Sequence, residues 1–365
     1  MRICIVVGTR PEIIKMSPII RECEKRGIDY FMIHTNQHYT YNMDKIFFED
    51  LDLAGPKYNL EIGSGSHGVQ TGKMLMGIEN TLLKEKPDVV MVEGDTNTIL
   101  AGALSASKLH IDVGHVEAGL RSFDKTMPEE INRILADHIS TYLFAPTSVS
   151  KSNLINEGIA ENDIYVVGNS IVDATLYNLE IAKEKSKVID QLKIEKQGYI
   201  LMTLHRQENV DHEMRLRKII TSIKAINDSY DLPIIYPIHP RTEKMIKTFG
   251  LERELNEINN LKLIQPLGYL DFLILEKNAQ LILTDSGGLQ EEACIMNVPC
   301  VTLRDNTERP ETVEAGKNVI VGVEKNEVLK GVKEMMNKDL SSKNPFGDGT
   351  TGKKIIEVLL NKTSY

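Results

Sequence analysis

Acidic and basic residues gather in one nineteen-residue segment, HVEAGLRSFDKTMPEEINR, at residues 115–133. Acids in a first helical turn, such as Glu129 and Glu130, are favoured by the helix dipole without any function. That account does not cover Glu117, which directly follows an apolar run. Carboxyl groups held close together have their pKa values pushed apart, which makes acid and base roles available near neutral pH. The segment therefore indicates proton transfer on a charged substrate.

Two other charged segments follow apolar runs in the first half of the chain. They are GTRPE at residues 8–12 and EGDTN at residues 93–97. The open N-terminus of a helix attracts anions, and Arg10 and Lys15 add positive charge there. This combination indicates phosphate binding, with a capped surface turn as the alternative. Asp95 either caps the following helix or places a carboxylate at the mouth of a sheet.

The second half of the chain has a different set of strand-end residues. HRQEN at 205–209 and HPR at 239–241 each follow an apolar run, and DSGG at 285–288 opens a helix that carries Glu292. Glycines at a helix N-terminus let a phosphate approach the backbone N–H groups. A carboxylate one turn into that helix can reach a ribose hydroxyl. These segments indicate a nucleotide site.

Two motifs in the chain are misleading. GSGSHG at 63–68 matches the dinucleotide-binding pattern GxGxxG, but it follows only a short strand candidate. The acid about 20 residues further on, Asp88, begins a strand instead of ending one. The sequence DSGG also occurs in serine proteases, but here it lies at a strand-to-helix turn, so we do not expect Ser286 to be a nucleophile.

Short apolar runs alternate with amphipathic helical patterns in two successive series. This alternation predicts the strands that the charged segments follow. The first series of predicted strands is 3–7, 30–34, 88–94, 111–117, 141–146 and 164–169. The second is 199–205, 233–240, 261–267, 279–288 and 298–304. Such a pattern predicts parallel sheets covered by helices on both faces. We therefore predict an α/β fold of two Rossmann-like, doubly wound domains with a deep cleft between them, where ligands would bind beyond the strands' carboxyl ends.

The predicted domain boundaries follow from this alternation. Residues 1–169 form an N-terminal domain with the acid–base residues, and residues 170–350 form a C-terminal domain that binds the nucleotide. The charge-rich helical stretch at 170–195 connects the two. Residues 351–365 contain a final helix, which we expect to pack back on the N-terminal domain.

Composition limits the classes of protein that this chain can be. It has 365 residues, of which 41% are hydrophobic and 26% charged, as is ordinary for a soluble globular protein. A net charge of −9 argues against a nucleic-acid binder. The four cysteines form no CxxC motif, so neither a metal nor a redox site is predicted. The N-terminal apolar run is too short for a signal peptide, and no run approaches the ~20 residues that span a membrane. We expect a cytoplasmic protein with no membrane partner.

Taken together, the motifs resemble those of the non-hydrolysing UDP-N-acetylglucosamine 2-epimerases. The resemblance extends from residue 3 to about residue 360 and uses both predicted domains. The matching segments are GTRPE (8–12), EGDT (93–96), HVEAGLR (115–121), PEEINR (128–133), TLHRQEN (203–209), HPR (239–241), DSGGLQEEA (285–293) and RDNTERPE (304–311).

This resemblance implies a GT-B-like fold, a homodimer and the interconversion of UDP-GlcNAc and UDP-ManNAc. In that family UDP is eliminated in an anti sense to leave 2-acetamidoglucal, and UDP then adds back while a proton is delivered to the opposite face. Neither a cofactor nor a metal is implied. The product would supply ManNAc-type sugars for glycan synthesis.

The resemblance also implies roles for individual residues. The acid–base and elimination residues would be Asp95, Glu117, Glu129 and His205. The substrate-binding residues would be Arg10, Lys15, Arg133, Ser286, Gly287, Gly288, Glu292 and Arg309. The resemblance selects Glu129 over Glu130; adjacent helical residues point about 100° apart, so only one of the two can face the site.

Bacterial members of that family also bind an activating second UDP-GlcNAc, and four residues fit that pattern: Gln37, His38, Arg206 and His239. Residues 39–42 depart from the polar and basic run that is usual there.

Three other functions would use parts of the same residue set. A retaining UDP-sugar glycosyltransferase would share the DSGG and glutamate site but would not need three carboxylates in the first domain. A hydrolysing epimerase would release ManNAc and UDP. A UDP-sugar sensor that closes on its ligand without turnover would not need the acids or His205.

Overall fold

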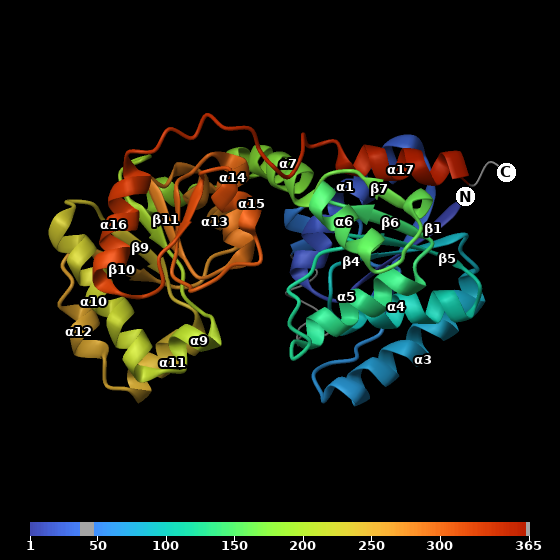
Figure 1. Ribbon diagram of the computed structural model, residues 1–365, viewed down its shortest axis with the longest axis horizontal. Helices are drawn as coiled ribbons and strands as arrows, with labels where there is room; N and C mark the ends of the chain where they lie inside the picture. The colour runs from blue at the N-terminus through green and yellow to red at the C-terminus, as the bar shows by residue number, and fades with distance from the viewer. Residues whose placement is uncertain (37–46, 363–365) are drawn as a thin grey trace. The chain divides into compact units, whose positions relative to one another are not determined.

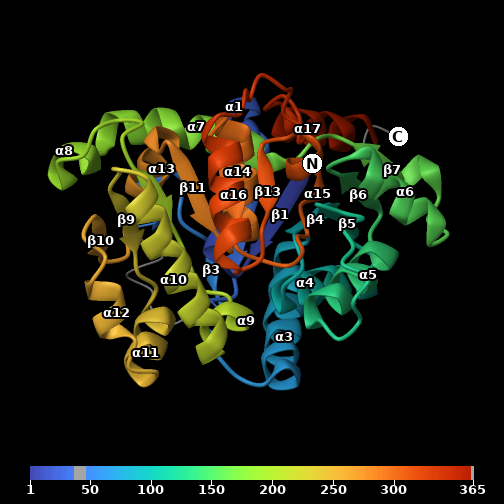
Figure 2. The same cartoon turned by 60° about the vertical axis from the view of Figure 1, so that its left-hand side comes forward.

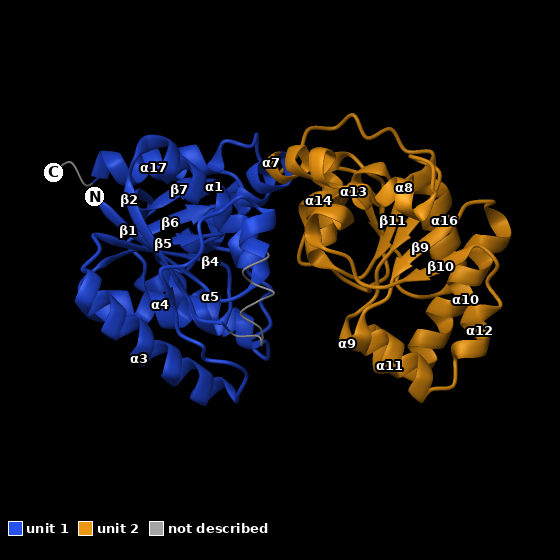
Figure 3. Cartoon of the chain, turned by 180° about the vertical axis from the view of Figure 1, so that it is seen from behind, with its two compact units in different colours: residues 1–176, 346–365 blue, residues 177–345 orange. Residues whose placement is uncertain are grey.

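The computed structural model describes residues 1–36 and 47–362, and its packing divides the chain into two compact units (Figure 3). Unit 1 comprises Met1–Leu176 and Phe346–Tyr365, and unit 2 comprises Tyr177–Pro345. The first boundary falls after residue 176 where we predicted 169, and the second falls after residue 345 where we predicted 350.

Unit 1 is built on a seven-stranded sheet in which all neighbouring strands pair in parallel. The order across the sheet is β3-β2-β1-β4-β5-β6-β7. The strands are β1 (Arg2–Val7), β2 (Asp29–His34), β3 (Tyr58–Asn59), β4 (Val89–Glu93), β5 (Asp112–Val116), β6 (Tyr142–Ala145) and β7 (Ile164–Val166).

Helices cover both faces of this sheet, as Figure 1 shows. Helices α1 and α17 pack together above the strands, and α3 packs on α4, which packs on α5, below them. The helices of unit 1 are α1 (Arg10–Arg26), α3 (His67–Glu85), α4 (Asn97–Lys108), α5 (Pro128–Ile139), α6 (Ser148–Asn156), the short 3-10 helix at Glu161–Asp163, and α17 (Thr351–Lys362). Helix α7 (Ser170–Lys185) begins in unit 1 and ends in unit 2.

Unit 2 repeats the arrangement with a six-stranded parallel sheet in the order β10-β9-β8-β11-β12-β13. Its strands are β8 (Ile200–Met202), β9 (Ile234–Pro237), β10 (Leu261–Ile264), β11 (Leu281–Thr284), β12 (Cys300–Thr302) and β13 (Asn318–Ile320). Helix α10 packs on α16, and α13 packs on α14 (Figure 2). The helices are α8 (Val188–Leu192), α9 (Gln207–Val210), α10 (Glu213–Ser229), α11 (Pro240–Thr248), α12 (Glu252–Asn256), α13 (Tyr269–Asn278), α14 (Gly287–Met296), α15 (Pro310–Glu314) and α16 (Lys325–Met336).

These strand orders confirm the predicted fold of two Rossmann-like, doubly wound domains. The central strands are buried along their length, as β4 and β11 show, which explains why they read as unbroken apolar runs. The sequence predictions leave out α3, β13 and α16, together with short helices such as α9, α12 and α15. The predicted cleft between the domains stays a prediction.

Each sheet reverses its strand order at one point, between β1 and β4 in unit 1 and between β8 and β11 in unit 2. Connections leave such a switch point in opposite directions, so a crevice opens beyond the carboxyl ends of the two strands. The charged segments that follow β1, β4, β8 and β11 in the sequence therefore lie at the two switch points.

Candidate active site

At the switch point of unit 1, Glu12 closes the turn between β1 and α1. Its carboxylate accepts hydrogen bonds from the backbone N–H groups of Gly8 (2.6 Å) and Thr9 (3.3 Å) and from the hydroxyl of Thr96 (2.7 Å). Burial raises the pKa of Glu12 to about 7, against the opposing effect of these hydrogen bonds. The GTRPE segment therefore contains a proton-binding group that also holds its own loop in place.

Beside it, Lys15 lies between two buried carboxyl groups. Its Nζ is 2.7 Å from Glu117 Oε2 and 3.2 Å from Glu93 Oε1. The other oxygen of Glu117 accepts a hydrogen bond from Asn169 Nδ2 at 2.8 Å. Glu117 has a φ of 66°, in the left-handed region that favours glycine. A glutamate held there at a backbone cost is typical of a functional position.

Asp95 and Arg133 form the second charged group of unit 1. Arg133 donates to Asp95 Oδ2 from Nη2 at 2.6 Å and from Nε at 3.0 Å. Asp95 keeps 32% of its side chain exposed, whereas the Glu117 side chain is only 4% exposed. One carboxylate is therefore open to a ligand and the other lies deeper in the fold.

The two glutamates in the first turn of α5 differ in burial and in contacts. Glu130 is buried and accepts hydrogen bonds from Ser122 N (3.0 Å), Phe123 N (2.9 Å) and Arg133 Nη1 (2.7 Å). Glu129 is exposed, and the structure gives it no hydrogen bond or ion pair within residues 1–36 and 47–362. Since Glu130 holds the loop, this arrangement favours Glu129 as the residue available to a substrate.

A buried pair, His115 and Asp137, supports the turns that carry these carboxylates. His115 Nδ1 is 2.7 Å from Asp137 Oδ1, and its Nε2 is 2.9 Å from the carbonyl oxygen of Gly94. Burial opposes a charge on His115, but Asp137 and these hydrogen bonds outweigh burial and raise its pKa. Asp137 also accepts from Gly119 N at 3.1 Å and pairs with Arg121 at 2.7 Å. The pair thus fixes the backbone directly before Asp95 and shortly after Glu117.

Arg10, which is also a predicted site residue of unit 1, is the first residue of α1. Its guanidinium lies 5.5 Å from the centroid of the Phe47 ring and is exposed. The described contacts do not bring it to the Lys15 and Glu117 group.

The switch point of unit 2 is organised around the buried carboxylate of Asp285. It accepts from His205 N (3.1 Å), Arg206 N (2.9 Å) and Asn209 Nδ2 (3.2 Å), and its Oδ1 is 3.3 Å from His205 Nδ1. Burial alone would raise the pKa of Asp285, but these hydrogen bonds lower it. A carboxylate at Nδ1 favours the tautomer in which that nitrogen carries the proton. The Nε2 atom of His205, on a side chain that is 37% exposed, is then directed away from Asp285.

The N-terminus of α14 follows directly. Ser286 is the N-cap, and its hydroxyl accepts from Leu289 N at 3.5 Å, while Gly287 and Gly288 begin the helix. A Cβ atom at Gly287 would lie 3.6 Å from Glu308 Oε2 and 3.8 Å from Arg206 Nη2. Arg304 pairs with Glu308 and lowers its pKa to about 2, although burial opposes this shift. The helix terminus therefore lies beside both an anion and a cation.

One turn into α14, the two glutamates again differ. Glu292 accepts a hydrogen bond from the Tyr269 hydroxyl at 3.3 Å, and Glu291 pairs with Arg309 at 2.7 Å. The structure thus places Ser286, Gly287 and Glu292 on one short helix, while Arg309 is held by the neighbouring glutamate.

The predicted activator residues are only partly described. Gln37 and His38 lie outside the described residues. Arg206 is near Gly287, and the His239 ring lies 5.7 Å from the His205 ring. Burial, followed by the charge of His205, lowers the pKa of His239, whose Nδ1 accepts from Arg241 N at 3.2 Å.

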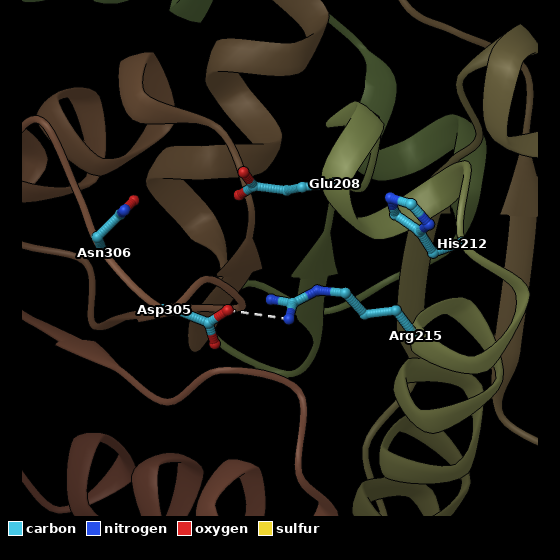
Figure 4. Close-up of a pocket in the computed structure, with 5 residues that line it drawn as sticks. All are labelled: Glu208, His212, Arg215, Asp305 and Asn306. Atoms are coloured by element: carbon cyan, nitrogen blue, oxygen red, sulfur yellow. Dashed lines mark ion pairs between the residues drawn. The ribbon is translucent and has the colours of Figure 1, made fainter. Parts of the chain in front are cut away.

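A polar pocket of about 270 Å³ lies next to this region of unit 2 (Figure 4). Its lining residues are Glu208, His212, Arg215, Asp305 and Asn306. Arg215 and Asp305 form an ion pair of 2.9 Å across it. Nowhere in residues 1–36 and 47–362 does the structure group three or more His, Cys, Asp or Glu side chains that could hold a metal ion. Across the same residues, every helix is too short or too polar to cross a membrane.

Sequence reasoning left several site residues without a role. They are Glu12, Glu93, His115, Asp137 and Asn169 in unit 1, and Asp285 and Glu308 in unit 2. A signal existed for some of them, because Glu93 and Asp285 are charged residues directly after apolar runs. His115 and Asp137 are identified only by the packing of α5 on β5.

Two Rossmann-like units, one with paired carboxylates at its switch point and one with a glycine-rich helix N-terminus and a histidine, define a nucleotide-sugar enzyme of the GT-B-like class. The family model of UDP-N-acetylglucosamine 2-epimerase matches residues 21–360. The UDP-N-acetylglucosamine 2-epimerase of Methanocaldococcus jannaschii is 62% identical over 98% of this chain and 99% of its own length.

Solved structures agree with that match. A crystal structure of the M. jannaschii UDP-GlcNAc 2-epimerase in complex with UDP-GlcNAc and UDP has a TM-score of 0.89 at 62% identity, covering 99% of this chain and 100% of that one. The Neisseria meningitidis enzyme bound to UDP-GlcNAc has a TM-score of 0.87 at 36% identity, with 99% and 100% covered. The chain belongs to the UDP-N-acetylglucosamine 2-epimerase family and is an isomerase.

Proposed function

We propose that this enzyme interconverts UDP-GlcNAc and UDP-ManNAc at C2 of the sugar. The observation that carries the proposal is the group of Lys15, Glu117, Asp95 and Arg133 at the carboxyl end of the unit 1 sheet. Inversion at C2 requires a proton to leave one face and return to the other. A pair of carboxylates in unlike environments, one exposed and one buried, supplies an acid and a base for that task.

The chemistry proceeds by elimination and re-addition. A carboxylate accepts the C2 proton while the C1–O bond to UDP breaks and its electron pair stays on the diphosphate oxygen. The electrons of the C2–H bond form the C1–C2 double bond of 2-acetamidoglucal. In the return step UDP attacks C1, and a carboxylic acid delivers a proton to the opposite face of C2. Asp95, Glu117 and Glu129 are the proposed proton-transfer residues.

Unit 2 holds the nucleotide in this proposal. The backbone N–H groups at Ser286, Gly287 and Gly288 bind the diphosphate, as open helix N-termini bind anions. His205, fixed by Asp285, stabilises the charge that develops on the departing oxygen. Glu292 accepts a hydrogen bond from a ribose hydroxyl, and Arg309 borders the same nucleotide. The cations Arg10, Lys15 and Arg133 offset the charge of the substrate.

The test follows the C2 proton directly. We would incubate the enzyme with UDP-GlcNAc in D₂O and record proton NMR spectra. UDP-ManNAc with deuterium at C2 and with the nucleotide retained is the expected result. Free ManNAc with UDP would show a hydrolysing enzyme instead, and an unchanged spectrum would overturn the proposal.

Three further properties remain proposals that the family resemblance supports. These are a homodimer, a cytoplasmic location and activation by a second UDP-GlcNAc near Arg206 and His239. Sedimentation of the pure protein and a rate curve against UDP-GlcNAc concentration, which is sigmoidal if a second molecule activates, test the first and the last.

A further inference from the structure

Glu93 is the last residue of β4. Its side chain is 2% exposed. In the register of the sheet Glu93 pairs with Val116 of β5, and Glu117 is the residue that follows Val116 in the chain. The carboxyl group of Glu93 and that of Glu117 both contact Lys15 Nζ, which brings the two carboxyl groups close together. Two carboxyl groups in such proximity repel each other when both are ionised, so one of them must keep a proton.

Charge balance agrees with that requirement. Among the ion pairs of residues 1–36 and 47–362, Lys15 is the cation that contacts both carboxyls, at 3.2 Å from Glu93 and 2.7 Å from Glu117. Two ionised carboxylates against one ammonium would leave a net negative charge in a buried place, which is costly. One shared proton makes the trio neutral.

The contacts also show which carboxyl keeps the proton. Both oxygens of Glu117 accept hydrogen bonds from donors, namely Lys15 Nζ and Asn169 Nδ2. Such donors favour the ionised form. For Glu93, burial raises the pKa well above its ordinary value; Lys15 opposes the shift, while Glu117 and Glu12 add to it. The proton therefore belongs to Glu93.

We propose that Glu93 is a positioning residue that holds one proton against Glu117, and that this proton keeps Glu117 an ionised, correctly oriented base for the C2 chemistry. The idea rests on the proposed function for its catalytic consequence but not for the proton itself. Among the described residues, the charged groups that act on Glu93 are Lys15 and Glu12 from α1 and Glu117 after β5. His115 on β5 binds the carbonyl of the next residue, Gly94.

The role of Glu93 gives the rate a particular dependence on pH. While Glu93 is protonated, it donates to Glu117 and adds no charge. When Glu93 ionises at alkaline pH, a second negative charge beside Glu117 raises the proton affinity of Glu117 and competes for Lys15. The rate should therefore fall on the alkaline side as Glu93 loses its proton. Glu93→Gln keeps a donor of the same shape but cannot ionise.

The experiment combines infrared spectroscopy with a pH–rate profile. At neutral pH the wild type should show one more protonated-carboxyl C=O band than Glu93→Gln in a difference spectrum. Glu12→Gln and Glu276→Gln provide reference spectra, because burial raises the pKa of both of those carboxyls. In the rate profile, Glu93→Gln should keep the neutral rate within about threefold and extend the alkaline limb by on the order of one pH unit. Glu93→Ala, which lacks the donor, should be slower at every pH.

A matched control is Glu79→Gln, the same substitution at an exposed position of α3 in the same unit. It should change neither the spectrum in the protonated-carboxyl region nor the alkaline limb. Equal spectra for the wild type and Glu93→Gln, or an unmoved alkaline limb, would overturn the proposal. If the wild type fails to epimerise UDP-GlcNAc, the proposed function fails while the spectra still decide whether Glu93 holds the proton. If Glu93→Gln does not fold, titration of the wild-type band against pH, with Glu12→Gln subtracted, replaces it.

Discussion

The two units share one topology but place opposite chemistry at the same point of it. Where unit 1 reverses its strand order, the carboxyl end of β4 and the segments after β1 and β4 carry Glu93, Glu12 and Asp95. Where unit 2 does so, the loops after β8 and β11 carry His205, Arg206 and a glycine-rich helix start. One switch point stores protons on carboxyl groups, and the other presents N–H groups and cations.

The difference lies in what each unit does with its buried acid. In unit 1, burial raises the pKa values of Glu12 and Glu93, so protons are held there near neutral pH. In unit 2, Asp285 is equally buried, but backbone and side-chain donors lower its pKa, so it remains a carboxylate that orients His205. A buried carboxyl group therefore holds a proton in one unit and stays an anion in the other, where His205 and the surrounding donors favour its charged form.

The comparison predicts that substitutions in unit 1 affect the reaction much more than binding. Glu117→Gln removes the ionised base but keeps the shape and the contact with Lys15. We expect kcat to fall by roughly 10²–10⁴-fold, the usual contribution of general acid–base catalysis, while UDP affinity stays within about twofold. Deuterium incorporation at C2 measures the first quantity and calorimetry with UDP measures the second. A near-normal rate would remove Glu117 from the mechanism.

A second prediction concerns how the proton on Glu12 makes the stability of the fold depend on pH. The pKa of Glu12 is about 7 in the folded protein and 4.5 ordinarily, so between these values the folded state binds more protons than the unfolded state. The free energy of unfolding should therefore fall as the pH rises through this window, by about 3 kcal/mol in all. Glu12→Gln keeps the hydrogen bonds to Gly8 and Thr9 but does not titrate.

Denaturant unfolding at pH 5 and pH 8 tests this prediction. The wild type should lose stability relative to Glu12→Gln between the two values, and the variant should be the more stable at pH 8. Parallel curves for the two proteins would show that Glu12 is ionised throughout and that its hydrogen bonds outweigh its burial.

These residues also show how far the sequence could predict the molecule. Alternating apolar runs were enough to predict two doubly wound sheets. Among the predicted site residues of unit 1, Asp95 and Glu117 follow strands, Arg10 and Glu129 lie in the first turn of a helix, and Lys15 and Arg133 lie one turn further along those helices. Helix α3 was not predicted, because Gly68, Gly72 and Gly77 interrupt it and glycine is a poor helix former. What a single sequence does not show is which strands are neighbours. Glu93 meets Glu117 because β4 pairs with β5, and both meet Lys15 because β4 also pairs with β1.

The smallest predicted effect belongs to unit 2, where a substitution should affect binding more than the reaction. Glu292→Ala removes the proposed ribose contact one turn into α14. We expect UDP affinity to fall about tenfold, as for one hydrogen bond to a charged group, while saturating UDP-GlcNAc restores most of the rate. Pyrophosphate is the matched ligand, because it reaches the helix N-terminus but has no ribose.

Binding of the two ligands to two variants sharpens the assignment. Glu292→Ala should weaken UDP and leave pyrophosphate unchanged, whereas Ser286→Ala, which removes the N-cap hydroxyl, should weaken both. Calorimetry measures all four affinities. Equal losses for UDP and pyrophosphate in Glu292→Ala would mean that Glu292 acts through the Tyr269 hydroxyl and the packing of α14, not through the ribose. The separation of reaction in unit 1 from binding in unit 2 would then be less complete, because α14, which binds the diphosphate in the proposed function, would depend on Glu292 for its shape.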